Sequence, residues 1–428
     1  MNRKVLVAAV AAAFVAPAAF AQSSVTVGGT VNILWDTVRG GGGTVANTNL
    51  KSHDRVRDGA GSNIRFTVIE DLGGGNSAFV QVESAVIQNS DQRGDLVGNP
   101  GTGITATGST TAVWGNRNSG VGIRSKAAGR FLIGVWDVHY HEHYAIDPAW
   151  IPGNSAWSTL SLTQNMGSGI AGMATTFGGR LSNVIRWDSP NWSGFSMGVT
   201  YSRPSDGAPP NAAGDVRDGK KNRNWSFSPR YEMGGLTVVY SYMQDKDGTS
   251  AGTPQFSIGG TNLGAAGATS AWKITSNRLG VRYKFAMGLG IGALWDVGKV
   301  SNTNLIAANQ IGIKRTVWAF PISYDTGNHH VMATWARARD WKGSFGGAGL
   351  GTPILIGATN YTLAGDTGAN FFSVGYMYNL SQRTNVSVGY ARTRNDALVR
   401  YDQFANSTGN TAIGVDPRSF SVGLRHTF

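Results

Sequence analysis

Apolar and polar residues alternate with a period of two along much of this chain. In the stretch FFSVGYMYNL, Phe372, Val374 and Tyr376 share one face, and Ser373 and Gly375 share the other. This period is that of a β-strand, whose successive side chains point to opposite sides. The same alternation recurs in GLTVVYSYMQ and SFSVGLRHTF. The pattern predicts an all-β fold built from strands with one apolar face each.

Short and long connections alternate between these predicted strands. Seven are tight and mostly rich in Gly, Asn or Ser: 72–76, 127–129, 191–194, 234–235, 287–290, 326–328 and 381–384. Eight are longer: 37–61, 88–117, 140–180, 204–222, 245–275, 301–310, 341–369 and 396–416. These fifteen connections join sixteen strands. The rhythm therefore predicts a 16-stranded antiparallel transmembrane β-barrel. A large soluble β-sandwich or propeller would explain the alternation, but not the alternating lengths of the connections.

The predicted last strand runs up to Phe428. Phe420, Val422, Leu424 and Phe428 share one parity, opposite Ser421. A closed barrel requires its last strand to pair with its first, since closure removes the free edges of the sheet. We therefore expect the residues up to Phe428 to lie within the sheet.

The first 21 residues have the form of an export signal. Arg3 and Lys4 precede an apolar run that ends in Ala19-Phe20-Ala21, which fits an A-x-A cleavage site. We expect a signal peptide over 1–21 and a single barrel domain over 22–428. No later run of eighteen apolar residues offers a spanning helix, so export leaves the periplasm, secretion or an outer-membrane barrel.

Composition excludes several classes of site. The chain has no cysteine, so thiol chemistry and Cys-type zinc sites are excluded. The net charge is +12, from 37 Lys and Arg against 25 Asp and Glu. The basic residues are scattered and form no long run, so we expect no nucleic-acid partner. The 60 glycines fit many tight turns and a curved sheet.

Three motifs resemble a known family. The stretches EDLGGGNSAFVQVES, NVIRWDSPNWSGFSMGVTYS and the closing VGLRHTF are similar to the general porins of Gram-negative outer membranes, particularly the betaproteobacterial type. The resemblance covers essentially the whole chain after residue 21. It implies a homotrimer of sixteen-stranded barrels, each with a water-filled pore and an inward-folded third loop. It also implies contact with outer-membrane lipid and lipopolysaccharide, and recognition of Phe428 by the barrel-assembly machinery.

Pore selectivity depends on the width of the channel and the charges on its wall. Reading inward parity from the apolar face gives the following candidate pore-wall residues: Arg65, Arg186, Arg278, Arg282, Lys284 and Arg425. The resemblance implies a ladder of wall arginines, of which Arg117 and Arg186 match the family pattern. Asn63, Thr67 and Val135 depart from that pattern. We therefore expect fewer basic residues to select anions in this pore than the resemblance implies. The alternative role for each candidate is a charged rim residue that binds lipopolysaccharide phosphates.

The third long connection supplies the candidate constriction loop. Glu142 and Asp147 are the only acids in the stretch from His139 to Arg180, so we expect them on the acidic side of the constriction. Trp150 and Trp157 either narrow the opening or pin the loop against the wall. Both alternatives remain open.

Three histidines alternate at the start of this loop. His139, His141 and His143 would share one face of an extended chain. They could bind zinc or copper, titrate near neutral pH as pore-lining groups, or be ordinary loop residues. We expect no metal and no cofactor, because the metal site depends on an unknown loop conformation.

The resulting expectation is passive diffusion of small hydrophilic solutes and ions through the outer membrane, with a mild preference for anions. A solute-specific channel is one alternative, suggested by the loop tryptophans. An additional adhesin or receptor role of the surface loops is another. No histidine lies in a recognisable catalytic motif, so we do not expect an enzyme.

Overall fold

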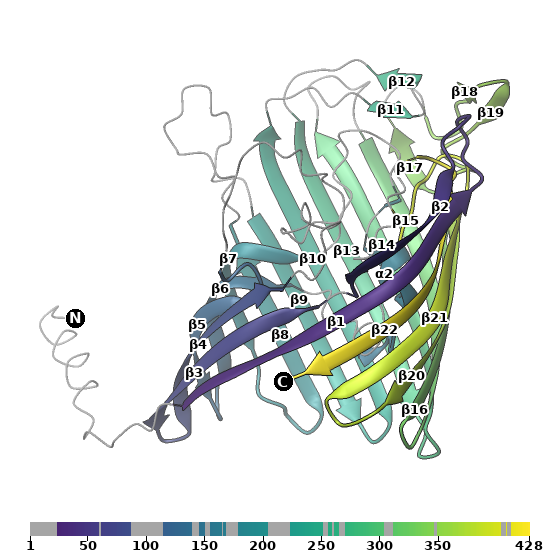
Figure 1. Ribbon diagram of the computed structural model, residues 1–428. Coiled ribbons are helices and arrows are strands. Elements are labelled where there is room, and N and C mark those ends of the chain that lie inside the picture. Colours follow the sequence, from purple (N-terminus) through teal and green to yellow (C-terminus); the bar gives the residue numbers. More distant parts are fainter. Residues whose placement is uncertain are drawn as a thin grey trace, which may run out of the picture.

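One sheet that starts with β1 and ends with β22 closes into a barrel in the computed structural model (Figure 1). The structure describes residues 24–59, 61–86, 114–138, 145–149, 155–164, 166–167, 179–203, 223–250, 256–258, 261–264, 270–303, 311–345, 349–403, 408 and 412–428. The main sheet has 18 strand segments. Since β2 continues β3 and β17 continues β16 along a shared neighbour, the wall has sixteen strand positions. The predicted sixteen-stranded antiparallel barrel is confirmed.

The strands of the wall have the following bounds: β1 Ser24–Gly41, β2 Leu50–Asp58, β3 Asn63–Gly73, β4 Asn76–Ala85, β5 Ser119–Ser125, β6 Gly129–Asp137, β7 Arg180–Asp188, β8 Phe195–Ser202, β9 Arg223–Met233, β10 Leu236–Ser250, β13 Ser270–Lys284, β14 Leu289–Thr303, β15 Ile311–Thr326, β16 His329–Ala338, β17 Lys342–Phe345, β20 Ala369–Asn379, β21 Thr384–Asn395 and β22 Asp416–Thr427. Two small hairpins lie outside the wall: β11 Phe256–Ile258 with β12 Thr261–Gly264, and β18 Ile354–Ile356 with β19 Thr359–Tyr361. Strand β5 has 7 residues whereas β15 has 16, so the wall differs in height around the barrel.

Strands β1 and β22 close the barrel, as expected. Their antiparallel register runs from Thr30 opposite Thr427 to Gly41 opposite Asp416. Beyond it, the Phe428 N–H donates to the Gly29 carbonyl at 3.1 Å, and the Gly29 N–H donates to the Phe428 carbonyl at 3.0 Å. The ladder therefore leaves no free edge between the first and last strands.

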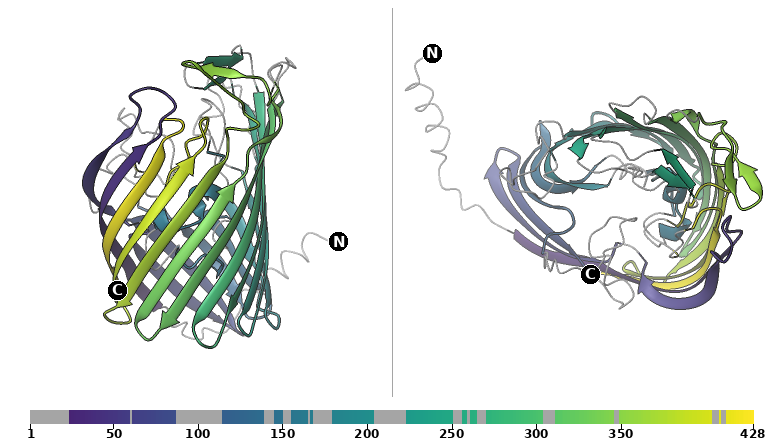
Figure 2. Two further views of the ribbon diagram at one scale, coloured as in Figure 1. Left: turned by 90° about the vertical axis from the view of Figure 1, so that its right-hand side faces the viewer. Right: turned by 90° about the horizontal axis from the view of Figure 1, so that it is seen from above.

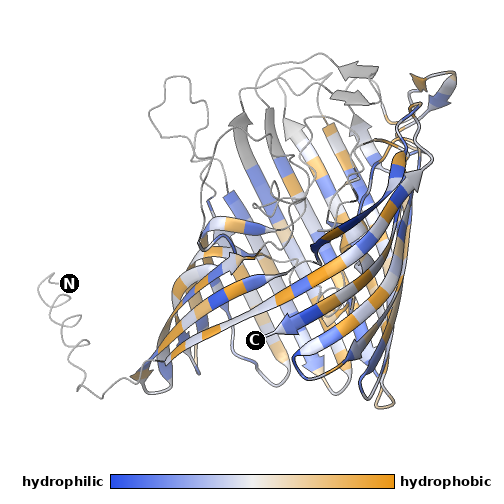
Figure 3. Ribbon diagram, in the orientation of Figure 1, coloured by the Kyte–Doolittle hydropathy of each residue, from blue (hydrophilic) through white to orange (hydrophobic). Residues whose placement is uncertain are grey.

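The outer face of the barrel is apolar. On β15, the side chains of Trp318, Phe320, Ile322 and Tyr324 are all more than 40% exposed, and Ala319 between them is buried. Such an exposed apolar band is what a lipid-facing wall requires. Figure 3 shows the alternation of polar and apolar residues along the strands. The apolar faces predicted for 371–380 and 235–244 also point outward.

A short segment lies inside the barrel and covers part of its inner wall. The segment contains the 3-10 helix η3 (Ser155–Trp157) and the helix α2 (Leu160–Thr163), both seen within the ring of strands (Figures 1 and 2). Trp157 and Leu162 belong to one buried apolar cluster with inward residues of the wall, such as Val317. No described helix has the length and apolar character needed to span a membrane.

At least four of the predicted loops are partly strand. Strand β14 runs to Thr303 in the connection 301–310, and β17 fills Lys342–Phe345 in 341–369. The stretches 37–61 and 245–275 were expected to be connections, but β1 reaches Gly41, β2 fills Leu50–Asp58 and β10 reaches Ser250. The hydrogen-bonded pairing of the strands continues in these stretches, but the side chains no longer alternate between apolar and polar. Strand residues above the lipid contact no hydrocarbon, so they need no apolar face. Alternation in hydropathy therefore underestimates the length of these strands. The seven tight turns lie where they were predicted.

Candidate functional site

The inner face of β13 carries three of the predicted basic residues. Arg278, Arg282 and Lys284 lie on the same side of this strand, with Gly280 between the first two. The Ile146 side chain would contact any Cβ added at Gly280, so the loop crosses the strand at this point. The three cations consequently have different surroundings.

Arg278 is held between the wall and the loop. Its side chain is only 3% exposed, and its Nε donates to Asp296 on β14 at 2.8 Å. Its second terminal nitrogen donates to the main-chain carbonyl of Thr163 at 3.1 Å. Arg278 therefore attaches α2 to the barrel wall and does not present a free charge to the pore.

Arg315 on β15 completes this attachment. Its guanidinium pairs with the other oxygen of Asp296 and donates to the main-chain carbonyl of Leu162. The last carbonyls of a helix have no partner within the helix and carry partial negative charge, so cations there are stabilising. We call Arg278, Asp296 and Arg315 the arginine clamp. All three side chains are buried.

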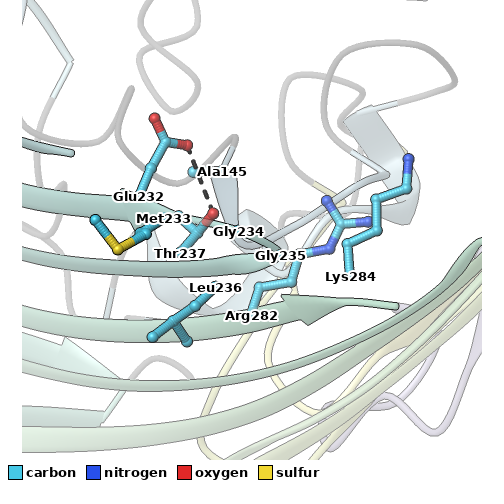
Figure 4. Close-up of a pocket in the computed structure, with 9 residues that line it drawn as sticks. All are labelled: Ala145, Glu232, Met233, Gly234, Gly235, Leu236, Thr237, Arg282 and Lys284. Carbon is cyan, nitrogen blue, oxygen red and sulfur yellow. Dashed lines mark hydrogen bonds between the residues drawn. The ribbon is translucent and has the colours of Figure 1, made fainter. Parts of the chain in front are cut away.

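Arg282 and Lys284 lie closer to the short-turn end. Arg282 donates to the Ser323 hydroxyl at 2.8 Å, and Lys284 pairs with Asp325 at 2.8 Å. Both side chains line a shallow hollow beside the turn at 234–235, together with Ala145 of the loop (Figure 4). On the same hollow, the Thr237 hydroxyl donates to Glu232 at 3.5 Å. These cations remain accessible from the interior of the barrel.

Arg65 and Arg117 lie near Glu83 on β4. In the register of β3 with β4, Arg65 is directly opposite Glu83 on the inner face. Arg117, in the turn before β5, donates from its Nε to Glu83 at 2.5 Å. Arg117 thus points toward the inner face, and Arg65 is exposed there.

Arg186 and Arg425 also lie on the inner face. Arg186 pairs with Asp188 at 2.6 Å and donates to the main-chain carbonyl of Asp137 at 3.2 Å. Arg425 on β22 lies opposite Asn32 and Asn385, on the face away from Leu424. Every basic residue predicted from inward parity therefore points inward. Arg278, however, is buried and holds the loop to the wall.

Asp147 is buried, which corrects its expected place on the pore surface. Its carboxylate accepts hydrogen bonds from the main-chain N–H of Thr159 at 2.7 Å and from the hydroxyls of Ser158 and Thr159 at 2.9 and 2.7 Å. It also accepts one from the Ala149 N–H at 3.1 Å. Burial raises the pKa of Asp147, while these hydrogen bonds oppose the shift. Asp147 ties the loop to itself just before α2.

Trp157 pins the loop against the wall, which is the second of its two expected roles. Its side chain is fully buried, and its main-chain carbonyl accepts from the Ser373 hydroxyl at 2.7 Å. A Cβ at Gly375 would lie 2.5 Å from the indole, and one at Gly389 would also clash with it. These two glycines on β20 and β21 leave the space that the ring occupies.

Five of the predicted residues lie outside the described residues: Glu142, Trp150, His139, His141 and His143. Their roles therefore remain predictions. Within the described ranges, no group of three or more His, Asp and Glu residues is arranged to hold a metal ion.

Sequence reasoning missed Asp296 and Arg315. The inward parity of β15 includes Ile313, Val317 and Ala319, so Arg315 lay on a face that read as apolar. The continuous apolar run from Val317 to Ile322 was the sequence signal that the inner face of this strand is covered. A strand buried on both faces loses its alternation, and here the inner face is covered by the loop.

Comparisons with known proteins agree on one family. The family model of the Gram-negative porin matches residues 8–398. An outer membrane porin protein of Bordetella pertussis is 28% identical over an alignment 461 positions long, which covers 100% of both chains. The anion-selective porin from Comamonas acidovorans has a TM-score of 0.62 at 20% identity, over 95% of this chain and 100% of that chain. Outer-membrane expressed OmpT of Vibrio cholerae has a TM-score of 0.59 at 12% identity, over 95% of this chain and 98% of its own.

The structural matches at these identities show a shared fold, and the family match shows the relationship. Together with the closed barrel and its polar, loop-lined interior, they identify an outer-membrane channel. The chain belongs to the Gram-negative porin family.

Proposed function

We propose that this porin conducts small hydrophilic solutes and ions passively, with a mild preference for anions. The observation that carries the proposal is an excess of unpaired cations on the inner wall. Four inward-facing arginines make no ion pair among the described residues: Arg65, Arg124, Arg282 and Arg425. Fixed charges of one sign along a pore raise the local concentration of the opposite ion.

Five acids of the inner wall are paired with cations, which supports the same conclusion. Each of five inward carboxylates pairs with at least one cation: Asp36 with Arg55 at 2.9 Å, Glu83 with Arg117, Asp188 with Arg186, Asp296 with Arg278, and Asp325 with Lys284. These five carboxylates therefore do not offset the charges of Arg65, Arg124, Arg282 and Arg425, which supports a preference for anions. The porin from Comamonas acidovorans, with the same fold, is named anion-selective.

The reversal potential across a planar bilayer tests this proposal. With a tenfold KCl gradient, we expect a potential whose sign corresponds to chloride permeating faster than potassium. A potential of the opposite sign would contradict the anion preference while leaving the channel function intact.

We propose that the channel assembles as a homotrimer through its short-stranded wall. The outward faces of β4 to β7 carry exposed aliphatic and aromatic side chains, including Val121, Ile123, Phe131, Ile133 and Ile185. The strands in this region have 7 to 10 residues, compared with 15 in β10. One structure of in-vitro folded OmpT of Vibrio cholerae is described as a trimer form. Cross-linking of the protein in outer-membrane vesicles would distinguish a trimer from a monomer.

We propose further that residues 1–21 are removed on export, that Phe428 contributes to recognition by the barrel-assembly machinery, and that the barrel has no enzymatic activity. N-terminal sequencing of protein from outer membranes tests the cleavage, with Gln22 as the expected first residue. Lipopolysaccharide is the remaining proposed partner.

A further inference from the structure

The hollow beside the turn at 234–235 carries opposite charges on its two sides. Glu232 lies on one side, and Arg282 and Lys284 lie on the other (Figure 4). Thr237 on β10 is paired in register with Glu232 on β9 and with Arg282 on β13. Glu232, Thr237 and Arg282 therefore form one row on the inner face of the barrel, in which the acid and the guanidinium are separated by a single strand.

Arg282 is held in place by the wall and keeps free donors. Its Nη2 donates to the Ser323 hydroxyl at 2.8 Å. A Cβ added at Gly290 would lie 2.7 Å from both this nitrogen and the Ser323 Oγ, so the glycine leaves the space that the guanidinium occupies. Among the described residues, the other N–H groups of Arg282 have no hydrogen-bond partner, and its charge has no ion-pair partner. Because a guanidinium presents its donors in a fixed fork that fits a carboxylate, Arg282 can bind a carboxylate that enters the hollow.

Lys284, the second cation of the hollow, is already paired. Its ammonium group lies 2.8 Å from one oxygen of Asp325, and the other oxygen of Asp325 lies 2.9 Å from the Nδ1 of His330. This ion pair reduces the charge that Lys284 contributes to the hollow. The cation with free donors for a solute is therefore Arg282.

Glu232 supplies the acidic side of the hollow. Its Oε1 accepts hydrogen bonds from Arg230 and, at 3.5 Å, from the Thr237 hydroxyl. Its Oε2 has no hydrogen-bond partner in the part of the chain that the structure describes, and the side chain is 44% exposed. Because each oxygen of an ionised carboxylate is an acceptor, Oε2 can accept a hydrogen bond from an ammonium group of a solute.

The spacing across the row matches a small molecule with two opposite charges. Neighbouring strands lie about 4.8 Å apart, so β9 and β13 are roughly 10 Å apart on either side of β10. In an α-amino acid, the ammonium nitrogen lies about 2.5 Å from the carboxylate carbon. With a hydrogen bond of about 2.9 Å at each end, such a molecule spans about 9 Å between its two protein partners. A solute with a single charge would use only one side of the hollow.

We propose that this hollow is a binding site for zwitterionic α-amino acids that pass through the pore, with the carboxylate on Arg282 and the ammonium group on Glu232. Hydrogen bonds between charged groups are stronger than neutral ones, and each end of the solute makes one here. A zwitterion has no net charge, so the net charge of the pore wall does not concentrate it, whereas the paired contacts do. The inference rests on the proposed passive diffusion of solutes and does not depend on the anion preference.

The test measures how solutes of similar size reduce the single-channel current in planar bilayers at constant ionic strength. Alanine is the zwitterion, lactate is the anion and lactamide is the neutral molecule. The variants are Glu232→Gln and Arg282→Gln, each of which removes one charge from the hollow. Glu70→Gln is the matched control, because Glu70 is an exposed acid near the short turn at 72–76 but faces outward, in register with Ala78.

We expect alanine to reduce the current of the parent and of the control with the same half-saturating concentration, and lactamide to produce no saturable reduction. Glu232→Gln and Arg282→Gln should each raise the half-saturating concentration of alanine about tenfold, because each loses a hydrogen bond between charged groups. Lactate should bind the parent less tightly than alanine does. Its binding should be lost in Arg282→Gln and kept in Glu232→Gln.

An unchanged half-saturating concentration of alanine in Glu232→Gln would overturn the proposal. So would equal binding of lactate and alanine by the parent, which would identify a site for anions only, or the absence of a saturable reduction by alanine. Conducting channels in KCl show that each variant has folded. A failure of the proposed channel or of its anion preference would appear in KCl without solute, and is thus distinguishable from a failure of this site.

Discussion

The guanidinium of Arg278 donates to the main-chain carbonyl of Thr163 at 3.1 Å, although 115 residues separate the two. Arg278 lies on the wall and Thr163 ends the helix inside the barrel. This hydrogen bond belongs to the arginine clamp, in which Asp296 holds both Arg278 and Arg315. The carbonyl end of α2 is therefore attached to β13 and β15, so we expect the loop to keep a fixed position in the pore.

Loss of the central acid of the clamp should destabilise the protein and loosen the loop. Asp296→Ala leaves two buried guanidinium groups without their shared carboxylate, which costs about 3–5 kcal/mol of the free energy of unfolding. We expect a lower midpoint in denaturant and greater current noise in single-channel recordings. Asp54→Ala, at an exposed acid of β2, is the matched control. Unchanged noise in Asp296→Ala would show that the clamp does not position the loop.

The packing of Trp157 against Gly375 and Gly389 should be sensitive to one added methyl group. Gly375→Ala would place a Cβ 2.5 Å from the indole, so the ring and the loop must shift. Overpacking of this kind costs about 1–3 kcal/mol, and we expect altered conductance together with the loss of stability. Trp157→Leu in the same chain should restore part of the stability. Gly351→Ala, where a Cβ meets no atom within 4 Å, is the control; an equal effect there would contradict the assignment.

The selectivity of the channel should follow the unpaired inward arginines. Arg65→Gln/Arg282→Gln removes two cations that have no acidic partner in the described residues, and should lower the permeability ratio of chloride to potassium. Arg39→Gln/Arg394→Gln removes two cations from the outward face and should leave the ratio unchanged. The reversal potential in a salt gradient measures both. An identical ratio in the inward variant and the parent would place the filter elsewhere in the pore.

Closure of the barrel should depend on the absence of a side chain at Gly29. A Cβ there would clash with the Asn63 carbonyl oxygen and lie 2.7 Å from the Phe428 ring. Gly29→Val should therefore disturb the junction of β1 with β3 and β22, and reduce the fraction of protein that resists unfolding in warm SDS. Gly41→Ala, at a position open to solvent, tests whether any added side chain on β1 has this effect. Resistance equal to that of the parent in Gly29→Val would rule out this role for Gly29.

The outer wall was predictable because each of its residues obeys a local rule. Phe372, Val374 and Tyr376 must face hydrocarbon, and the next residue along the chain must then face inward. Parity alone therefore placed Arg65, Arg186 and Arg425 on the inner face. The tight turns were predictable for the same reason, since they need glycine or small polar residues within a few positions.

The local pattern did not predict which inward residues are buried against the loop and which remain accessible in the pore. Arg278 and Arg282 are four positions apart on one strand and have the same parity, yet one is clamped to Thr163 and the other faces the open hollow. Asp147 and Trp157 read equally well as pore-facing groups, but both are buried by contacts with residues of the loop or of the distant β20 and β21. The contacts of Arg278 and Trp157 join residues more than a hundred positions apart, whereas Asp147 contacts residues up to 12 positions away; no period in the sequence encodes either kind of contact.

The sequence by itself determined the number of strands, the face that meets lipid and the face on which the basic residues of single strands lie. Those properties depend on the alternation of side chains along single strands and on the solvent at each face. Only the tertiary structure decided which charges remain in water and which hold the loop. That division arises because a carboxylate or guanidinium exposed on the inner wall has no partner until a distant part of the chain folds against it.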